Sequence, residues 1–278
     1  MRDELTPKPN HPPGFRDRIL VAFRRRQWRG FVRLYERLKP TAARRLLRTL
    51  TRYGTQFFLN PWDSVDSYVI NEGFYESEVL EAVRPGLAPG TVLWVVGANF
   101  GLHAITAKRL HPETNVVAFE PSPAMGARLL ENCELNDVRV DLHAYALSAE
   151  NGALPFFANA SGNPGMSTLH PVEGLPYDHR FVVATLTAQN VIKLQLAPMP
   201  NAIILDAEGA EIDVLKGFGL LLHAPDLRMI VFEALNEFLE TVPGELRILI
   251  TSAGFKIEKL KRNEDTAHSL SNFVAFRT

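Results

Sequence analysis

The chain has 278 residues, of which 46% are hydrophobic and 22% are charged, and its formal net charge is −1 at pH 7. Its single cysteine, Cys133, excludes an intramolecular disulfide, and no apolar run approaches the roughly 20 residues needed to span a bilayer. Residues 1–14 are polar and proline-rich, unlike a secretory signal. We therefore expect a cytoplasmic enzyme or binding protein, either one large α/β domain with an appendage or two small domains.

Positive charge is concentrated near the N-terminus. Residues 1–53 hold 15 Lys and Arg against four Asp and Glu, a net charge of +11, whereas the remainder has a net charge of −12. Two basic amphipathic patterns, residues 15–38 and 41–54, predict a pair of helices. We therefore divide the chain into a basic helical N-terminal arm, residues 1–53, and a second domain, residues 54–278.

The charge of the arm indicates what it contacts. We expect residues 16–52 to meet a membrane surface peripherally or to bind an acidic partner. The alternatives are docking on the acidic remainder of the same chain and a solvated face without a partner. We expect no nucleic-acid partner.

After the arm, residues 63–73 predict a strand, and residues 74–83 predict a helix that ends at Pro85-Gly86. From residue 91 onward, apolar strands alternate with helices. The predicted strands are residues 92–96, 115–120, 138–147, 181–186, 201–206, 227–235, 255–260 and 271–278. The predicted helices are residues 101–110, one that begins at Ser122-Pro123, one capped by Thr187, one within residues 207–218, and one that ends just before Gly254. Turn signals in residues 150–170 predict a hairpin-like insertion.

Alternation of this kind predicts right-handed βαβ units and a mainly parallel sheet. Ligands of such sheets bind at the carboxyl ends of the strands. Three predicted strand ends carry informative residues, namely Gly97-Ala98-Asn99, Glu120, and Asp206 to Glu208. We therefore expect the functional site at this edge of the sheet.

Residues 93–105, LWVVGANFGLHAI, place two glycines in an otherwise apolar strand-to-helix turn. One interpretation is that a ligand lies against this turn, where a Cβ would collide with it; the other is tight packing of the helix on the strand. The Gly-x-x-x-Gly spacing differs from the Gly-x-Gly-x-x-Gly of dinucleotide-binding proteins. It therefore disfavours a nicotinamide-dependent oxidoreductase.

Glu120 ends the strand that follows the glycine turn. A carboxylate there can accept hydrogen bonds from both ribose hydroxyls of an adenosine. A ribose site without a pyrophosphate site indicates S-adenosylmethionine (SAM), whose own carboxylate would meet backbone N–H groups of the glycine turn. The alternative is an exposed glutamate with no ligand.

The segments GFYESEVLE, VVGANFG, VAFEPSP, LLENCELN, AIILDAEGAEIDVLKG and NFVAFR follow one another between residues 60 and 278. This series resembles the FkbM family of SAM-dependent methyltransferases. The resemblance implies a class I, Rossmann-like α/β fold with a seven-stranded, mostly parallel sheet and an antiparallel last strand, here preceded by the N-terminal helical arm. It also implies O-methylation of a hydroxyl on a sugar, glycan or secondary metabolite, carried out by residues 54–278.

The same resemblance implies roles for individual residues. It places Gly97, Ala98, Asn99 and Gly101 in the SAM-binding turn, Glu120 on the ribose, and Asp206 and Glu208 at the acidic floor of the reaction site. Two positions depart from the family pattern, because Val95 and Thr187 stand where acidic residues are usual. Thr187 can still cap a helix, whereas Val95 supports the alternative of a non-catalytic, methyltransferase-like binding protein.

Methyl transfer to a hydroxyl requires a group that accepts the proton of that hydroxyl. We assign this role to Glu208, an orienting and cofactor-binding role to Asp206, and a further catalytic position to Glu233 at the end of the strand MIVFE. The alternative for Asp206 and Glu208 is the general preference of acidic residues for helix N-termini. The three isolated histidines, His103, His143 and His170, are interpreted as structural, and no His or Cys cluster indicates a metal site.

Overall fold

The computed structural model describes residues 46–159, 166–175, 177–235, 244–261 and 270–277. The chain forms two compact units, residues 1–75 and residues 76–278. The first helical pattern of the predicted arm, residues 15–38, lies outside the described residues. The arm and its boundary after residue 53 therefore stay predictions.

The described part of the first unit is a hairpin followed by a helix. Strand β1 (Leu47–Leu50) pairs antiparallel with β2 (Gln56–Leu59), and helix α3 (Ser64–Glu72) comes next. Phe57 and Leu59 of β2 are fully buried. Their burial gives the hairpin the apolar anchor that an isolated pair of strands lacks.

Two predictions for the first unit are wrong. The helical pattern of residues 41–54 contains strand β1 in its described part, because pairing with the buried strand β2 outweighs the local helical spacing. Residues 63–73 form helix α3 rather than a strand. The Asp63 side chain caps this helix by accepting hydrogen bonds from the N–H groups of Val65 and Asp66, and Gly73 ends it in a left-handed conformation.

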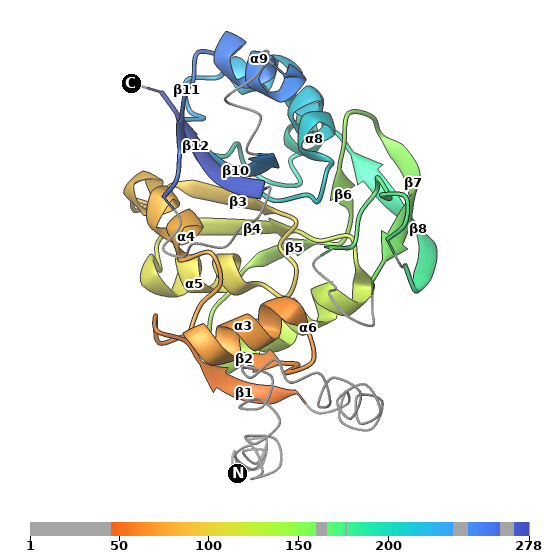
Figure 1. Cartoon of the computed structure of the whole chain (residues 1–278). Helices are drawn as coiled ribbons and strands as arrows, with labels where there is room; N and C mark the ends of the chain where they lie inside the picture. The colour runs from red at the N-terminus through yellow and green to blue at the C-terminus, as the bar shows by residue number, and fades with distance from the viewer. Residues whose placement is uncertain (1–45, 160–165, 176, 236–243, 262–269, 278) are drawn as a thin grey trace. The chain divides into compact units, whose positions relative to one another are not determined.

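The second unit is built on a seven-stranded sheet (Figure 1). In the order β11-β12-β10-β9-β3-β4-β5, its strands are Lys256–Lys259, Leu270–Phe276, Met229–Leu235, Ala202–Leu205, Val92–Val96, Asn115–Phe119 and Asp141–His143. Strand β12 runs antiparallel to both of its neighbours, and the other paired strands are parallel. The predicted fold, a mostly parallel seven-stranded sheet with an antiparallel last strand, is confirmed.

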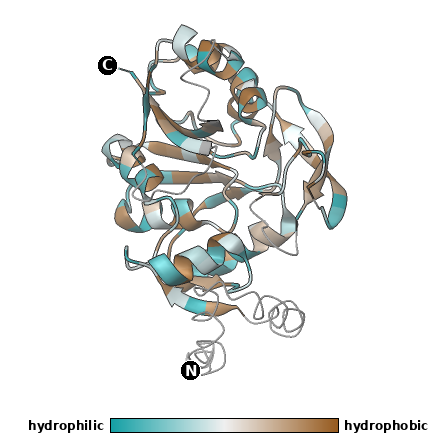
Figure 2. Ribbon diagram, in the orientation of Figure 1, coloured by the Kyte–Doolittle hydropathy of each residue, from teal (hydrophilic) through white to brown (hydrophobic). Residues whose placement is uncertain are grey.

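Helices cover both faces of this sheet (Figure 1). Those on one side are α4 (Ser77–Val83), α5 (Leu102–Leu110) and α6 (Pro123–Asn136), and those on the other include α8 (Glu211–Phe218) and α9 (Glu245–Ser252). Two short 3₁₀ helices, η1 (Arg84–Gly86) and η3 (Gly219–His223), follow α4 and α8 respectively. The central strands are the most hydrophobic part of the unit (Figure 2), and Trp94 of β3 packs against Phe218 of α8 with ring centroids 5.6 Å apart.

Two helix starts confirm their predicted caps. The Ser122 hydroxyl accepts a hydrogen bond from the Met125 N–H at the start of α6, and the Thr187 hydroxyl accepts one from the Asn190 N–H at the start of α7 (Ala188–Lys193). The substitution of threonine for the usual acidic residue at position 187 therefore preserves the helix start.

A smaller, three-stranded sheet lies beside the main one (Figure 1). It has the order β6-β8-β7, with β6 (Ala146–Leu147), β7 (Gly152–Ala158) and β8 (His179–Leu186). The single strand predicted over residues 138–147 is therefore divided between two sheets, as β5 and β6. The strand predicted over residues 181–186 is real, but it pairs with β7 and β6 outside the main sheet.

In the described residues, no helix has both the length and the apolar character needed to cross a bilayer.

Candidate active site

The glycine turn between β3 and α5 is shaped by contacts within the chain itself. Gly97 has φ +77°, and a Cβ at this position would overlap the backbone carbonyl of Asp206. Gly101 has φ +92°, and a Cβ there would lie 2.8 Å from Ile105 Cδ1 and 2.9 Å from Leu129 Cγ. The close approach that requires glycine at these two positions therefore comes from β9, α5 and α6.

The backbone N–H groups of this turn are all engaged. Those of Gly97 and Ala98 donate to the Phe119 carbonyl at 3.0 and 3.1 Å, and that of Gly101 donates to the Ala98 carbonyl. Asn99, at φ +50°, donates its N–H to Glu120 Oε2 at 2.8 Å, and Phe100 donates its N–H to Asn99 Oδ1. The contact expected between the turn amides and a ligand carboxylate therefore has no open donor in this conformation.

Glu120 is held rigidly at the end of β4. The residue is 6% exposed, and its Oε1 and Oε2 atoms accept hydrogen bonds from the N–H groups of Ser122 and Asn99, both at 2.8 Å. Burial raises its pKa to about 7, although both backbone hydrogen bonds act in the opposite direction. A carboxylate oxygen can accept two hydrogen bonds, so each oxygen keeps one position for a ligand hydroxyl.

Asp206 and Glu233 lie side by side at the carboxyl edge of the main sheet. Leu205 of β9 and Phe232 of β10 are partners in a parallel pair, and the two acidic residues follow directly after them. The Oδ1 atom of Asp206 is inaccessible to water and has no hydrogen-bond partner among the described residues. Burial raises the pKa of Asp206 well above its usual range, and the neighbouring carboxylates, first of all Glu208, add to the increase.

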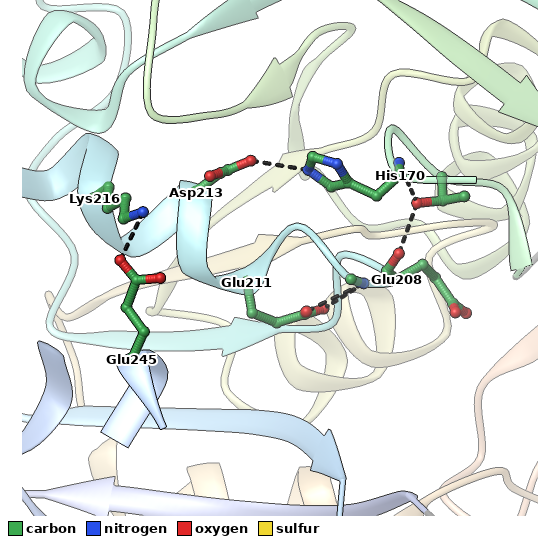
Figure 3. Close-up of polar contacts among 8 residues, drawn as sticks. His170, Glu208, Glu211, Asp213, Lys216 and Glu245 are labelled. Atoms are coloured by element: carbon green, nitrogen blue, oxygen red, sulfur yellow. Dashed lines mark hydrogen bonds and ion pairs between the residues drawn. The ribbon is translucent and has the colours of Figure 1, made fainter. Parts of the chain in front are cut away.

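Glu208 follows in the loop between β9 and α8. Its backbone is left-handed, with φ +50°, a conformation that costs a non-glycine residue on the order of 1–3 kcal/mol and often marks a functional position. Burial, with Glu233, Glu211 and Glu76 as further causes, raises its pKa to about 8. The Glu211 carboxylate folds back onto this loop and accepts hydrogen bonds from the N–H groups of Ala207 and Gly209 (Figure 3).

Glu76 is an acidic residue at this edge that the sequence analysis did not select. It precedes helix α4 with a left-handed backbone, φ +50°, and its charge contributes to the raised pKa of both Asp206 and Glu208. The segment GFYES was used as a mark of the family resemblance, and Glu76 was placed inside the helix predicted over residues 74–83, whereas α4 begins at Ser77. The position of Glu76 beside β9 depends on tertiary packing.

The edge thus brings together most of the predicted site residues. Gly97, Asp206, Glu208 and Glu233 gather around the ends of β3, β9 and β10, and Glu120 lies with Asn99 at the end of β4. Val95 is buried within β3, between Ala118 and Ile204 in the sheet register, where it is part of the apolar core.

The three histidines lie in different surroundings. Burial lowers the pKa of His103 to about 4, and the His143 ring stacks on Phe119 with centroids 5.2 Å apart. His170 Nε2 is 2.8 Å from Asp213 Oδ2 on α8. Across the described parts of the chain, no group of three or more His, Cys, Asp or Glu residues is arranged to hold a metal ion.

Comparison with known proteins adds to this geometry. The sequence profile of the Methyltransferase FkbM domain matches residues 96–257. The chain belongs to the FkbM methyltransferase family. The expectation of a SAM-dependent methyltransferase is thereby confirmed.

Several curated relatives can be aligned with the chain. Hexuronic acid methyltransferase AglP of Haloferax volcanii is 29% identical over 195 residues, which cover 68% of this chain and 74% of the relative. Methyltransferase sdnD of Sordaria araneosa is 32% identical over 44% of this chain and 58% of its own length. The 31-O-demethyl-FK506 methyltransferase FkbM of Streptomyces tacrolimicus is 37% identical over 31% of this chain and 32% of its own length.

Among solved structures, the FkbM methyltransferase of Methylobacillus flagellatus KT aligns with a TM-score of 0.45 and 14% identity. The alignment covers 70% of this chain and 47% of that one.

Proposed function

We propose that this FkbM-family methyltransferase transfers the methyl group of SAM to a hydroxyl oxygen of a sugar or secondary metabolite. One relative is named for hexuronic acid and another for 31-O-demethyl-FK506, which supports an oxygen acceptor here. The observation that carries the proposal is the acidic edge formed by Asp206, Glu208 and Glu233, in which Asp206 Oδ1 is buried without a partner.

The residues of this edge fit SAM, which carries a positively charged sulfonium and an ammonium group. Glu120 would accept the ribose hydroxyls, because each of its oxygens keeps one acceptor position. Asp206 Oδ1 would accept a hydrogen bond from the ammonium group. This hydrogen bond would remove the cost of burying an unpaired carboxylate oxygen. When bound, SAM supplies a methyl group on a positively charged sulfur atom.

Glu208 is proposed to accept the proton of the acceptor hydroxyl. With a pKa of about 8, its carboxyl group is mostly protonated at neutral pH while no cation is near. A cation bound at the edge favours the ionised form, so binding of the positively charged cofactor lowers the pKa of Glu208 and generates the base. A carboxylate with a pKa near the working pH is an efficient proton acceptor.

The charge of the edge favours an uncharged acceptor. The charged residues that shift the pKa of Asp206 are all acidic, namely Glu208, Glu233, Glu76 and Glu211. An acceptor with its own carboxylate would add another negative charge to this group. We therefore propose a neutral hydroxyl compound rather than a uronic acid, with Glu233 in contact with a second hydroxyl of the same acceptor.

The test of this function is a matched panel of acceptors. Methyl glycosides of neutral hexoses, each paired with the corresponding uronic acid, are incubated with the protein and methyl-labelled SAM. We expect label on the neutral member of a pair, in excess over the uronic acid by about 10-fold or more, since one close like charge in a partly buried site costs roughly 1–2 kcal/mol. Equal or faster labelling of the uronic acids would contradict the neutral-acceptor assignment.

Two variants accompany the panel. Asp206→Asn removes the charge that is proposed to hold the cofactor and should weaken SAM binding. Asp213→Asn changes a partly exposed acid of helix α8, which contacts His170 rather than the acidic edge, and should bind SAM like the wild type. Wild-type protein that binds SAM but labels no hydroxyl compound of the panel would count against a sugar acceptor.

A further inference from the structure

Thr168 is firmly anchored in the three-stranded sheet region. It is 3% exposed, and both of its backbone groups are paired with Phe157 of β7: the Thr168 N–H donates to the Phe157 carbonyl at 3.0 Å, and the Phe157 N–H donates to the Thr168 carbonyl at 2.9 Å. Strand β7 is in turn paired with β8 along its length. The Thr168 side chain therefore projects from a rigid support.

The hydroxyl of Thr168 connects this support to the acidic edge. It donates a hydrogen bond to the backbone carbonyl of Glu208 at 2.7 Å and accepts one from the His170 N–H at 2.9 Å. Glu208 lies 40 residues further along the chain. Because the hydroxyl donates its proton in the hydrogen bond to the Glu208 carbonyl, its orientation is fixed.

The loop that receives this hydrogen bond requires outside support. Glu208 and Gly209 both have left-handed backbones, with φ +50° and +96°, and Glu208 has no glycine-like freedom to adopt this conformation. The Glu211 carboxylate holds the N–H groups of Ala207 and Gly209, and Thr168 holds the Glu208 carbonyl between them. The two restraints together fix the backbone at Glu208, and therefore the direction in which its side chain leaves the loop.

A second link joins the same two segments, but at the surface. The His170 Nε2 to Asp213 Oδ2 contact is 2.8 Å long, with side chains 49% and 29% exposed (Figure 3). Solvent-accessible contacts of this kind contribute about 1 kcal/mol or less. The buried hydrogen bond from Thr168 is therefore the main restraint on the Glu208 loop. A variant of His170, which removes only the surface contact, serves as the control for variants of Thr168.

We propose that Thr168 is a positioning residue, whose hydroxyl fixes the backbone of Glu208 and thereby holds the Glu208 carboxylate at the acidic edge. This inference rests on the proposed function for the role of Glu208 in proton transfer. Its geometric part, the restraint of Glu208 by Thr168, can be tested without any acceptor.

The experiment compares Thr168→Val, which keeps the shape and removes the hydroxyl, with Thr168→Ser, which keeps the hydroxyl. The readout is the titration of the Glu208 carboxyl group by NMR in ¹³C-glutamate-labelled full-length protein, with the signal assigned by its loss in Glu208→Gln. We expect the pKa of Glu208 in Thr168→Val to fall by about one unit or more toward its usual range, because the released loop exposes the carboxyl group to water. Thr168→Ser and His170→Gln should titrate like the wild type.

Methyl transfer gives the second readout. In Thr168→Val we expect kcat to fall by about 10-fold or more, since displacements of the order of 1 Å can cost about 10²-fold, while KM for SAM changes little. If Thr168→Val does not fold, Thr168→Ala, which leaves room for a water molecule, provides the same comparison.

The outcomes separate the two claims. A wild-type Glu208 titration in Thr168→Val and Thr168→Ala overturns the positioning role, whatever the activity. A lowered pKa in these variants, together with full activity of Glu208→Gln, supports the positioning role and overturns the proton-transfer role instead.

Discussion

The backbone carbonyl oxygen of Asp206 occupies the space that a Cβ on Gly97 would need. Gly97 follows β3 and Asp206 follows β9, and these strands are neighbours in the sheet. The glycine turn and the acidic edge are therefore packed directly against each other. A change in the turn is expected to displace the carboxylates as well.

Gly97→Ala should consequently impair both stability and cofactor binding. The new methyl group meets backbone rather than a flexible side chain, so β9 must shift, and we expect a loss of at least about 2–3 kcal/mol in the free energy of unfolding. Urea unfolding and calorimetric titration with S-adenosylhomocysteine measure the two effects. Gly90→Ala is the matched control, because Gly90 also has a positive φ, +78°, but nothing lies within 4 Å of its Cβ position; this variant should lose about 1 kcal/mol and bind normally.

Glu120→Gln should weaken S-adenosylhomocysteine binding with little change in the fold. The amide oxygen can still accept one of the two backbone N–H groups, but the amide nitrogen replaces an acceptor with a donor. We expect an affinity loss on the order of 1–3 kcal/mol in calorimetric titration. Glu131→Gln, on the exposed side of α6, serves as the control, and unchanged affinity in Glu120→Gln would remove Glu120 from the ribose site.

The raised pKa of Glu208 predicts a pH-dependent stability in the ligand-free protein. A carboxyl group whose pKa is raised by folding stabilises the folded state below its usual pKa of 4.5, and this contribution is lost as the pH rises through about 8. Relative to Glu208→Gln, the free energy of unfolding of the wild type should therefore fall by about 2–4 kcal/mol between pH 4.5 and 8.5. Chemical unfolding across this range measures the difference, and a constant difference would show that the carboxyl group titrates normally.

The N-terminal arm makes a separate prediction. If residues 16–52 meet an anionic surface, binding to phosphatidylserine-containing vesicles should weaken steeply between low and physiological salt. Deletion of residues 1–45 preserves strand β1 and should abolish vesicle binding while S-adenosylhomocysteine binding persists. If the full chain does not bind vesicles, or binds them independently of salt, the membrane interpretation is wrong and the acidic-partner interpretation remains.

Much of the second unit follows from local sequence. The strand VLWVV is apolar along its whole length because it is buried, and its short length and the glycine that follows it separate it from a helix. In NVVAF the four residues after Asn115 are apolar and buried in the same way. The Ser122-Pro123 pair marks a helix start through a hydrogen bond within three residues. Such signals depend on neighbours in the sequence and can be read without the fold.

Other features could not be predicted in this way. The pattern of residues 47–50 fits a helix, but the strand forms because β2 offers a buried partner. Gly97 was interpreted through a ligand or through packing of the helix on the strand, whereas the atom that excludes its Cβ belongs to Asp206, after the neighbouring strand β9. Thr168 and Glu76 contribute to the acidic edge through contacts across long stretches of chain, and no local spacing marks them.

The central claim is that Glu208 accepts the proton during methyl transfer, and single-turnover methylation by Glu208→Gln tests it most directly. The reaction uses enzyme saturated with methyl-labelled SAM and the best neutral acceptor from the glycoside panel, so that cofactor affinity does not enter the rate. We predict weaker SAM binding, because a cofactor that lowers the pKa of Glu208 binds more tightly when this carboxyl group is ionised, and a methyl-transfer rate lower by about 10²-fold or more at saturating SAM. A rate equal to that of the wild type would contradict the account and direct attention to Asp206 and Glu233.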